Sequence, residues 1–96
     1  MTSTGEPASL SEILNPLTSL TMNAIQAEAL RAHCRHAGHS LLSKQMTNTE
    51  RLAILVEEVG EVAHALTHDG DKDNLEIELI QVAAVAASWI EVLTTR

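Results

Sequence analysis

The chain has 96 residues, which is enough for one small domain and not for two. Its 13 acidic residues outnumber six Lys and Arg and give a net charge of −7, which argues against non-specific binding to a nucleic-acid backbone. Trp89 is the only aromatic residue, so the core must be built from Leu, Ile, Val and Ala at helical spacing. This composition predicts an all-α protein.

The sequence also indicates a compartment. Cys34 is the only cysteine, so an internal disulfide is excluded and a reduced, cytoplasmic setting is the simplest inference. The N-terminus lacks the basic region and apolar core of a signal peptide. The longest apolar stretch, residues 79–93, is interrupted by polar residues and falls short of the ~20 residues that span a bilayer.

The first part of the chain divides into a tail and a helix. Residues 1–17 are expected to form a disordered or irregular tail, with at most a helical turn at 10–14. The folded domain is expected to cover residues 18–96. Its first long helix is predicted over residues 18–37, and Gly38 is a plausible stop signal.

A basic segment follows this helix. It contains His33, His36 and His39 together with Arg31, Arg35 and Lys44. A zinc site is disfavoured here because structural zinc usually has four nitrogen or sulfur ligands at recognisable spacings. The alternatives are a solvated basic rim and a rim that contacts phosphates, for which Arg35 and Lys44 are the better candidates.

The second helix is predicted from Thr47 or Asn48 to about His68. Thr47 or Asn48 is suited to the N-cap, and the acidic Glu50 lies in the first turn. Arg51 is expected to pair with Glu58 or to reach a phosphate of a substrate. The predicted core stripe of this helix consists of Leu52, Leu55, Val59, Ala63 and Leu66.

The polar segment 69–74 resembles the start of a calcium-binding EF-hand loop. That motif needs Gly at its sixth position and Glu at its twelfth, and these positions hold Asn74 and Ile80. A plain turn before the next helix is therefore predicted.

The third helix is predicted over residues 74–94 and is apolar on nearly every side. A helix of this kind is normally buried, and one short chain can hardly cover it. We therefore expect its Ala-rich face to meet a second copy of the chain, in a homodimer or homotetramer. Trp89 is expected to belong to the core, with stacking on a nucleotide base as the alternative.

Two acidic clusters lie on these last two helices. With about 100° of rotation per residue, Glu57, Glu58 and Glu61 share one sector, and Glu78 and Gln81 share a face of the following helix. If the helices pack antiparallel with these faces opposed, the oxygen ligands converge as Mg²⁺ requires. The plain alternative is that the glutamates form a solvated helix face.

The two motifs together resemble a known family. Residues 55–63, Leu-Val-Glu-Glu-Val-Gly-Glu-Val-Ala, and residues 78–83, Glu-Leu-Ile-Gln-Val-Ala, look like the signatures of the MazG-like branch of the all-α nucleoside triphosphate pyrophosphohydrolases. The resemblance covers roughly residues 21–94. The departure is Gln81, where the family motif has Asp, and a neutral carbonyl oxygen is a weaker metal ligand than a carboxylate.

The resemblance implies a helical bundle with antiparallel core helices, completed by homo-oligomerisation, that hydrolyses a ribo- or deoxyribonucleoside triphosphate to the monophosphate and pyrophosphate. It implies Mg²⁺, with Mn²⁺ as an alternative, to polarise the phosphates and activate water. The implied metal ligands are Glu57, Glu58, Glu61, Glu78 and Gln81. Glu57 and Glu61 are the implied catalytic residues, and Arg35, Lys44, Arg51 and Trp89 are the candidate substrate contacts.

Two rival interpretations remain open. The first is a non-catalytic helical module of the same fold that binds a nucleotide or a protein, and Gln81 is the feature in its favour. The second is a plain structural bundle, in which replacing Glu58 or Glu61 would affect no ligand. No membrane and no nucleic-acid polymer is expected as a partner.

Overall fold

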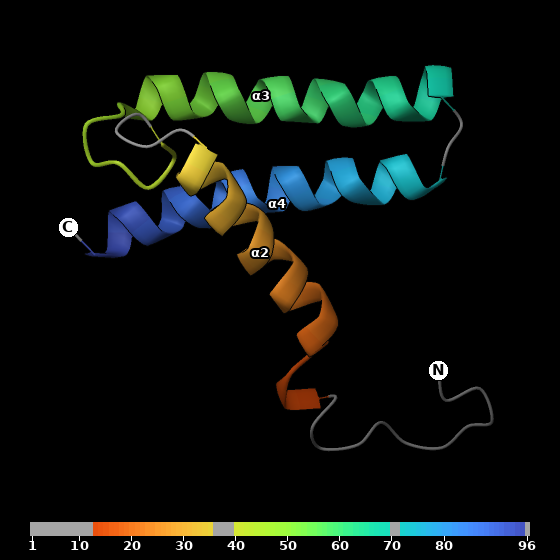
Figure 1. The fold of residues 1–96 in the computed structure, drawn as a ribbon, viewed down its shortest axis with the longest axis horizontal. Coiled ribbons are helices and arrows are strands. Elements are labelled where there is room, and N and C mark those ends of the chain that lie inside the picture. Colours follow the sequence, from red (N-terminus) through yellow and green to blue (C-terminus); the bar gives the residue numbers. More distant parts are fainter. Residues whose placement is uncertain (1–12, 36–39, 70–71, 96) are drawn as a thin grey trace.

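The structure is a computed structural model that describes residues 13–35, 40–69 and 72–95. These residues form the helices α2 (Ser19–Arg35), α3 (Asn48–His64) and α4 (Lys72–Thr95), with a π-helical segment, η1 (Ala65–Asp69), that continues α3. No strand occurs in these ranges, so the predicted all-α class is confirmed there. α4 packs against both α2 and α3, as Figure 1 shows.

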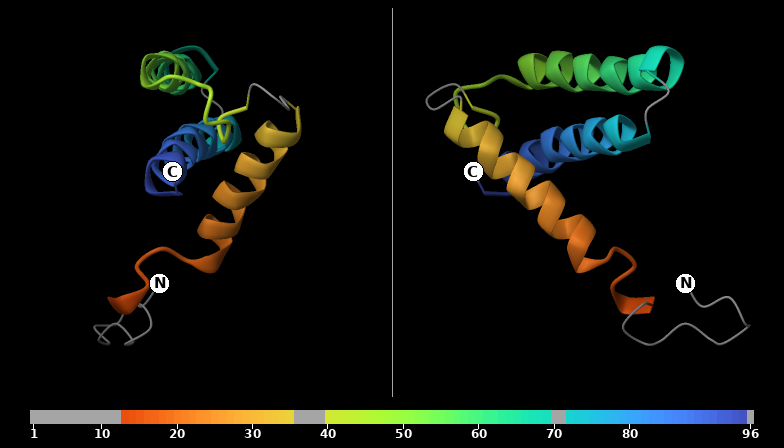
Figure 2. Two further views of the ribbon diagram at one scale, coloured as in Figure 1. Left: turned by 90° about the vertical axis from the view of Figure 1, so that its left-hand side faces the viewer. Right: turned by 45° about the vertical axis from the view of Figure 1, so that its right-hand side comes forward.

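α2 begins where the sequence predicts. The backbone carbonyl of Thr18 accepts from the Met22 amide at 3.0 Å, and its hydroxyl accepts from the Thr21 amide at 3.2 Å. α2 then crosses the α3–α4 pair obliquely and extends beyond it (Figure 2). Before it, Ile13 and Leu14 are helical. Residues 1–12 and the segment with His36, Gly38 and His39 lie outside the described ranges.

α3 starts with a capping box, as its sequence predicts. The Thr47 hydroxyl accepts from the Glu50 amide at 3.1 Å, and the Thr47 amide donates to the Glu50 carboxylate at 2.8 Å. These two bonds satisfy amides that the helix itself leaves unpaired. The second helix was predicted to run to about His68. In the structure α3 ends at His64, and η1 continues the helical chain to Asp69.

The inner face of α3 differs from the predicted core stripe. Leu52, Val59 and Leu66 are each more than half exposed, Ala63 is exposed too, and only Leu55 of that stripe is half-buried. The prediction of a core stripe is therefore wrong for the single chain. The residues of α3 and η1 that are buried or half-buried form a neighbouring stripe: Arg51, Ile54, Leu55, Glu58, Val62 and Ala65.

The connection between α2 and α3 is fixed by a buried arginine. Arg51 is only 1% exposed, and its guanidinium donates to the backbone carbonyls of Leu41 and Ser43. Ser40, also buried, shares a hydrogen bond of 2.6 Å with Nδ1 of His33 at the end of α2. The connection is thus tied to both of the helices that it joins.

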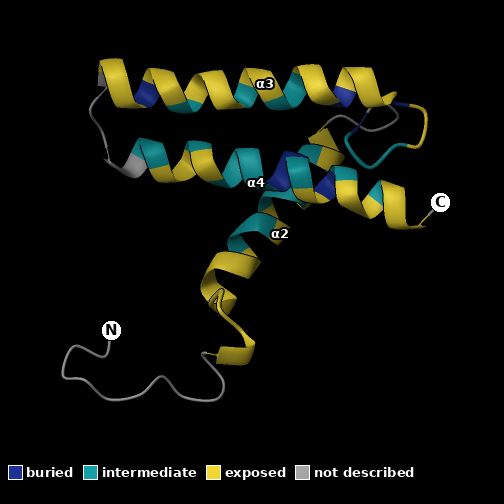
Figure 3. Ribbon diagram, turned by 180° about the vertical axis from the view of Figure 1, so that it is seen from behind, coloured by how far each residue is buried: buried dark blue, intermediate teal, exposed yellow. Residues whose placement is uncertain are grey.

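α4 is buried only along its middle. Ala84, Val85 and Ser88 are buried, whereas Ile90 and Leu79 are largely exposed, and Figure 3 shows how little of the molecule lies in the buried class. The Ala-rich face was expected to meet a second copy. Part of it is instead covered within the single chain, because Ala84 is already buried there.

The segment Asn74–Thr95 of α4 is long and apolar enough, at 22 residues, to cross a membrane by length and composition alone. This corrects the prediction that no stretch reaches that length. The reason is that the helix begins before the apolar run 79–93 and adds a further turn to it. The middle of α4 packs on α2 and α3, although only 17% of the apolar window is buried.

Candidate functional site

A cavity of about 680 Å³ lies between α2, the connection that follows it, α3 and α4. Its lining includes four glutamates, two arginines of α2 and several apolar residues. Its lining residues are Glu28, Arg31, Ala32, Arg35, Ser40, Leu41, Met46, Glu50, Ala53, Ile54, Glu57, Glu58, Gln81, Ala84 and Val85.

Gln81 joins the two acidic clusters at this cavity. With its amide nitrogen facing the carboxylates, Gln81 donates to Oε2 of Glu58 at 3.1 Å and to Oε2 of Glu78 at 3.2 Å. The side chains of Glu58, Glu78 and Gln81 therefore lie together, which is the condition on which the expected metal site depends. The two N–H donors of one neutral amide thus serve the two carboxylates, which gives them hydrogen bonds but no positive charge.

The electrostatics around Glu58 follow from this geometry. Partial burial raises the pKa of Glu58, and the negative charges of Glu78, Glu61, Glu57 and Glu28 raise it further. The charges of four other glutamates thus act on the partly desolvated carboxyl group of Glu58. A cation placed there would relieve the repulsion among them.

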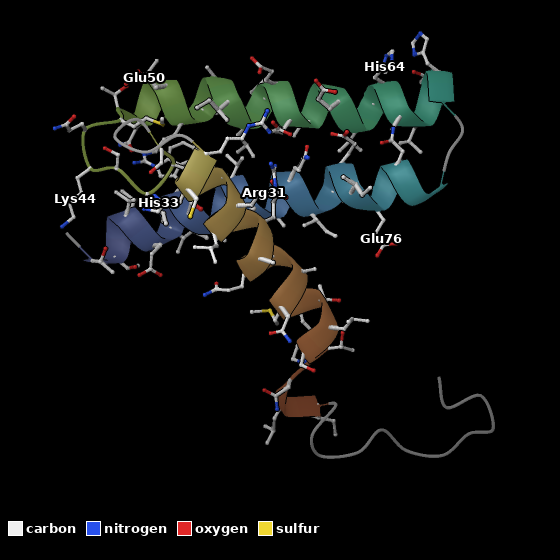
Figure 4. The ribbon with its side chains drawn as sticks, viewed as in Figure 1. Arg31, His33, Lys44, Glu50, His64 and Glu76 are labelled. Carbon is white, nitrogen blue, oxygen red and sulfur yellow. The ribbon has the colours of Figure 1, made fainter. Side chains whose placement is uncertain are left out.

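The other two predicted glutamates of α3 lie at different distances from the cavity. Glu57 is exposed and contributes to the cavity wall. Glu61 is exposed and is not among the lining residues, although it is close enough to affect the pKa of Glu58. Not every glutamate belongs to this group, because Figure 4 shows Glu76 pointing away from α3.

Two further residues of α2 belong to the site: Glu28, which the sequence did not indicate, and Arg31, which was predicted only as part of the basic segment. Arg31 lies beside Glu28 in a two-point ion pair, with Nε donating to Oε1 at 3.0 Å and an Nη to Oε2 at 2.5 Å. This pairing raises the pKa of Arg31 and places a fixed positive charge at the acidic group. The i, i+3 spacing indicated the ion pair, but nothing in the sequence indicated which helix α2 would face.

The donor set suits a hard divalent cation, because carboxylate and amide oxygens are the ligands that Mg²⁺ prefers. The mutual repulsion that raises the pKa of Glu58 fits such an ion as well. In their present rotamers, however, the described residues include no group of three or more His, Cys, Asp or Glu side chains close enough to hold a metal. The carboxylates would have to turn inward for the ion, with Gln81 releasing them.

The predicted substrate contacts fall into two groups. Arg35 lines the cavity. Lys44 donates instead to the Thr95 carbonyl at 3.4 Å, near the C-terminal end of α4 (Figure 4). The Trp89 indole donates to Oδ1 of Asn48 at 2.9 Å, and Arg51 is buried against the connection. Neither Trp89 nor Arg51 is among the lining residues, so we assign both a structural role.

Comparisons of the chain with protein-family models, with curated proteins and with solved structures each find no match. The functional inference therefore depends on the cavity and on the motifs that line it.

Proposed function

We propose that this protein is a MazG-like nucleoside triphosphate pyrophosphohydrolase that hydrolyses a ribo- or deoxyribonucleoside triphosphate to the monophosphate and pyrophosphate, in the cytoplasm. The observation that carries the proposal is the set of glutamates around Glu58, whose pKa is raised by partial burial and by these charges, at the wall of a cavity large enough for a nucleotide. A partly buried excess of negative charge without function would only destabilise the fold.

In this proposal Glu57, Glu58, Glu61, Glu78 and Gln81 hold one or more Mg²⁺ or Mn²⁺ ions on the antiparallel pair of α3 and α4. The ion supplies polarisation of the phosphates and an activated water. The chain's own part is to place the triphosphate between this group and the α2 arginines. Arg31 and Arg35 bind phosphate oxygens, and Glu57, exposed at the cavity wall, accepts the proton of the attacking water.

The apolar part of the wall suits the base or sugar of the substrate. Leu41 and Met46 from the connection, Ile54 from α3 and Val85 from α4 lie on this side. They would exclude water and provide van der Waals contact without selecting a particular base by hydrogen bonds. Specificity would then depend mainly on the shape of the cavity.

The test is pyrophosphate release from a panel of ribo- and deoxyribonucleoside triphosphates, with Mg²⁺, with Mn²⁺ and with chelator. We expect metal-dependent release that falls at least about 100-fold in Glu58→Gln and Glu61→Gln. Glu76→Gln is the matched control, because this glutamate of α4 points away from α3. No release from any nucleotide, or equal loss in the control, would contradict the proposal.

A second function is favoured by the present contacts of Gln81. A module that binds a nucleotide without cleaving it would keep the cavity but lack a complete metal site, and Gln81 holds two of the carboxylates without any charge of its own. Calorimetric titration with the same nucleotides and Gln81→Asp separate the two functions. Binding without turnover in the parent, and turnover gained in Gln81→Asp, would favour the module.

A further inference from the structure

Two histidines lie together where α3 passes into η1. His64 is the last residue of α3, and His68 lies four residues further on in η1. Their rings are stacked, with centroids 4.4 Å apart and ring planes 17° from parallel. Both side chains are exposed, and Figure 4 shows His64 at the opposite end of α3 from Glu50. Neither histidine lines the cavity between α2, α3 and α4, so the proposed pyrophosphohydrolase site does not use this pair.

The hydrogen bonds of Thr67 determine which nitrogen of the His68 ring carries a hydrogen. The Thr67 hydroxyl donates its only hydrogen to the Ala63 carbonyl at 2.9 Å. The same hydroxyl oxygen lies 2.7 Å from Nδ1 of His68, so it accepts there and Nδ1 is the donor. In the neutral ring Nε2 then has the free lone pair. A histidine that donates through one ring nitrogen and offers the other is in the form that binds a metal ion.

The helix geometry around the pair is unusual. η1 (Ala65–Asp69) is a π-helical turn that directly continues α3. Such turns are rare and occur frequently at functional sites. The stacked rings show that His64 and His68 share one face across this turn. Two histidines at positions i and i+4 on one helix face are a known arrangement of zinc ligands.

We propose that His64 and His68 form a binding site for a late first-row transition-metal ion, Zn²⁺, Ni²⁺ or Cu²⁺, separate from the cavity. Imidazole nitrogens suit these ions, whereas Mg²⁺ and Mn²⁺ prefer carboxylate oxygens. Metal–nitrogen bonds of about 2.0–2.1 Å hold two ligand nitrogens on the order of 3 Å apart. Rings whose centroids are already 4.4 Å apart reach this geometry by rotation about their side-chain bonds. Thr67 is a positioning residue, because its hydroxyl holds the His68 ring.

The site has an open coordination sphere. Among the residues that the structure describes, no third His, Cys, Asp or Glu side chain joins the pair closely enough to form a metal-binding group. Water or a group of a bound molecule therefore completes the coordination, as in sites that keep an exchangeable position. The ion would link the last residue of α3 to η1 and, by binding only the folded chain, would stabilise it.

Isothermal titration calorimetry of the full chain with Zn²⁺, in excess Mg²⁺, tests the proposal. The Mg²⁺ competes for carboxylates and leaves the imidazoles free. We expect one Zn²⁺ per chain, with an affinity that falls at least about 10-fold in His64→Gln and in His68→Gln. The matched control replaces two other histidines, His36→Gln with His39→Gln, and should keep the parent affinity. No binding by the parent, or a loss in the control as large as in His64→Gln, would overturn the proposal.

Two further measurements test the geometry of the site. Thr67→Val should lower the Zn²⁺ affinity about 10-fold, because the His68 ring loses its acceptor, whereas Thr67→Ser keeps the hydroxyl and should keep the affinity. The electron paramagnetic resonance spectrum of the Cu²⁺ complex should show coordinated nitrogen in the parent and less of it in His68→Gln. Equal affinities of the two Thr67 variants would overturn the role of Thr67, and a spectrum with oxygen ligands alone would overturn the site.

The test is independent of hydrolysis and of folding defects. Both histidines are exposed, so their glutamine variants should unfold at the parent Tm when chelator is present. Added Zn²⁺ should raise the Tm of the parent and of the His36 and His39 control, but not that of His64→Gln. An equal rise in His64→Gln would contradict binding at this pair, whether or not the protein releases pyrophosphate.

Discussion

At the scale of single residues, Gln81 decides the character of the site. Its amide lies between Glu58 and Glu78 and donates to both. An aspartate there would add one more negative charge to a group whose repulsion already raises the pKa of Glu58. Compared with an aspartate, Gln81 therefore makes the folded, metal-free protein more stable and leaves less negative charge to bind a cation.

Glu58→Gln should stabilise the metal-free protein at neutral pH. Folding raises the pKa of Glu58, so the contribution of this residue to stability is fully present below the ordinary glutamate pKa and is lost as the pH rises through the raised pKa. We expect Glu58→Gln to raise the Tm by a few degrees at pH 7 and to lose this gain below about pH 4. Thermal unfolding followed by circular dichroism with chelator measures it, and a gain independent of pH would contradict this explanation.

Arg51→Ala should destabilise the protein by about 3 kcal/mol. The substitution removes two charge-assisted hydrogen bonds and leaves the part-buried carbonyls of Leu41 and Ser43 without their donor. Urea unfolding measures the loss. Arg31→Ala, which removes an exposed ion pair, is the control and should cost less than about 1 kcal/mol. Equal losses in the two variants would argue against a structural role for Arg51.

The sequence predicts several parts of the site and misses others. The shared helix face of Glu78 and Gln81 follows from their spacing, which is a local property, whereas their contact with Glu58 depends on how α3 and α4 pack. The positions of Glu28 and Arg31 depend on how α2 crosses the other helices, and that is decided by packing over the whole chain. The burial of Arg51 likewise depends on tertiary structure, because its hydrogen-bond acceptors belong to the connection between α2 and α3.

At the scale of elements, the helix starts are set by short-range chemistry. Thr18 and Thr47 each cap a helix with the side-chain oxygen that their residue type predicts. The rotation of α3 is different, because two apolar stripes lie side by side on this helix and either is a plausible core face. The structure turns the stripe with Arg51 and Glu58 inward, so the choice depends on tertiary partners and not on periodicity.

Thr47→Ala should destabilise the protein by about 1 kcal/mol, because both bonds of the capping box depend on this residue's position and one on its hydroxyl. Chemical denaturation measures the change. Thr94→Ala, which removes a hydroxyl bonded within the last turn of α4, is the control and should have a smaller effect. A similar loss in both variants would contradict the role of the cap.

At the scale of the whole molecule, the buried core of the described residues is small, and the resemblance implies a homo-oligomer that would cover more of the apolar surface. We therefore expect the Tm of the protein to rise with protein concentration, because dilution favours dissociated chains that unfold more easily. Differential scanning calorimetry at several concentrations measures this, and a Tm that does not change with concentration would contradict the expected association.

The hydrogen bond between Trp89 and Asn48 has an optical consequence. It joins the late part of α4 to the first residue of α3, and the chain has no other Trp, Tyr or Phe. The intrinsic fluorescence of the protein thus comes from this one junction, whereas far-ultraviolet circular dichroism averages over all its helices. In a stopped-flow refolding experiment the two signals would report separately the docking of α3 on α4 and the formation of the helices themselves.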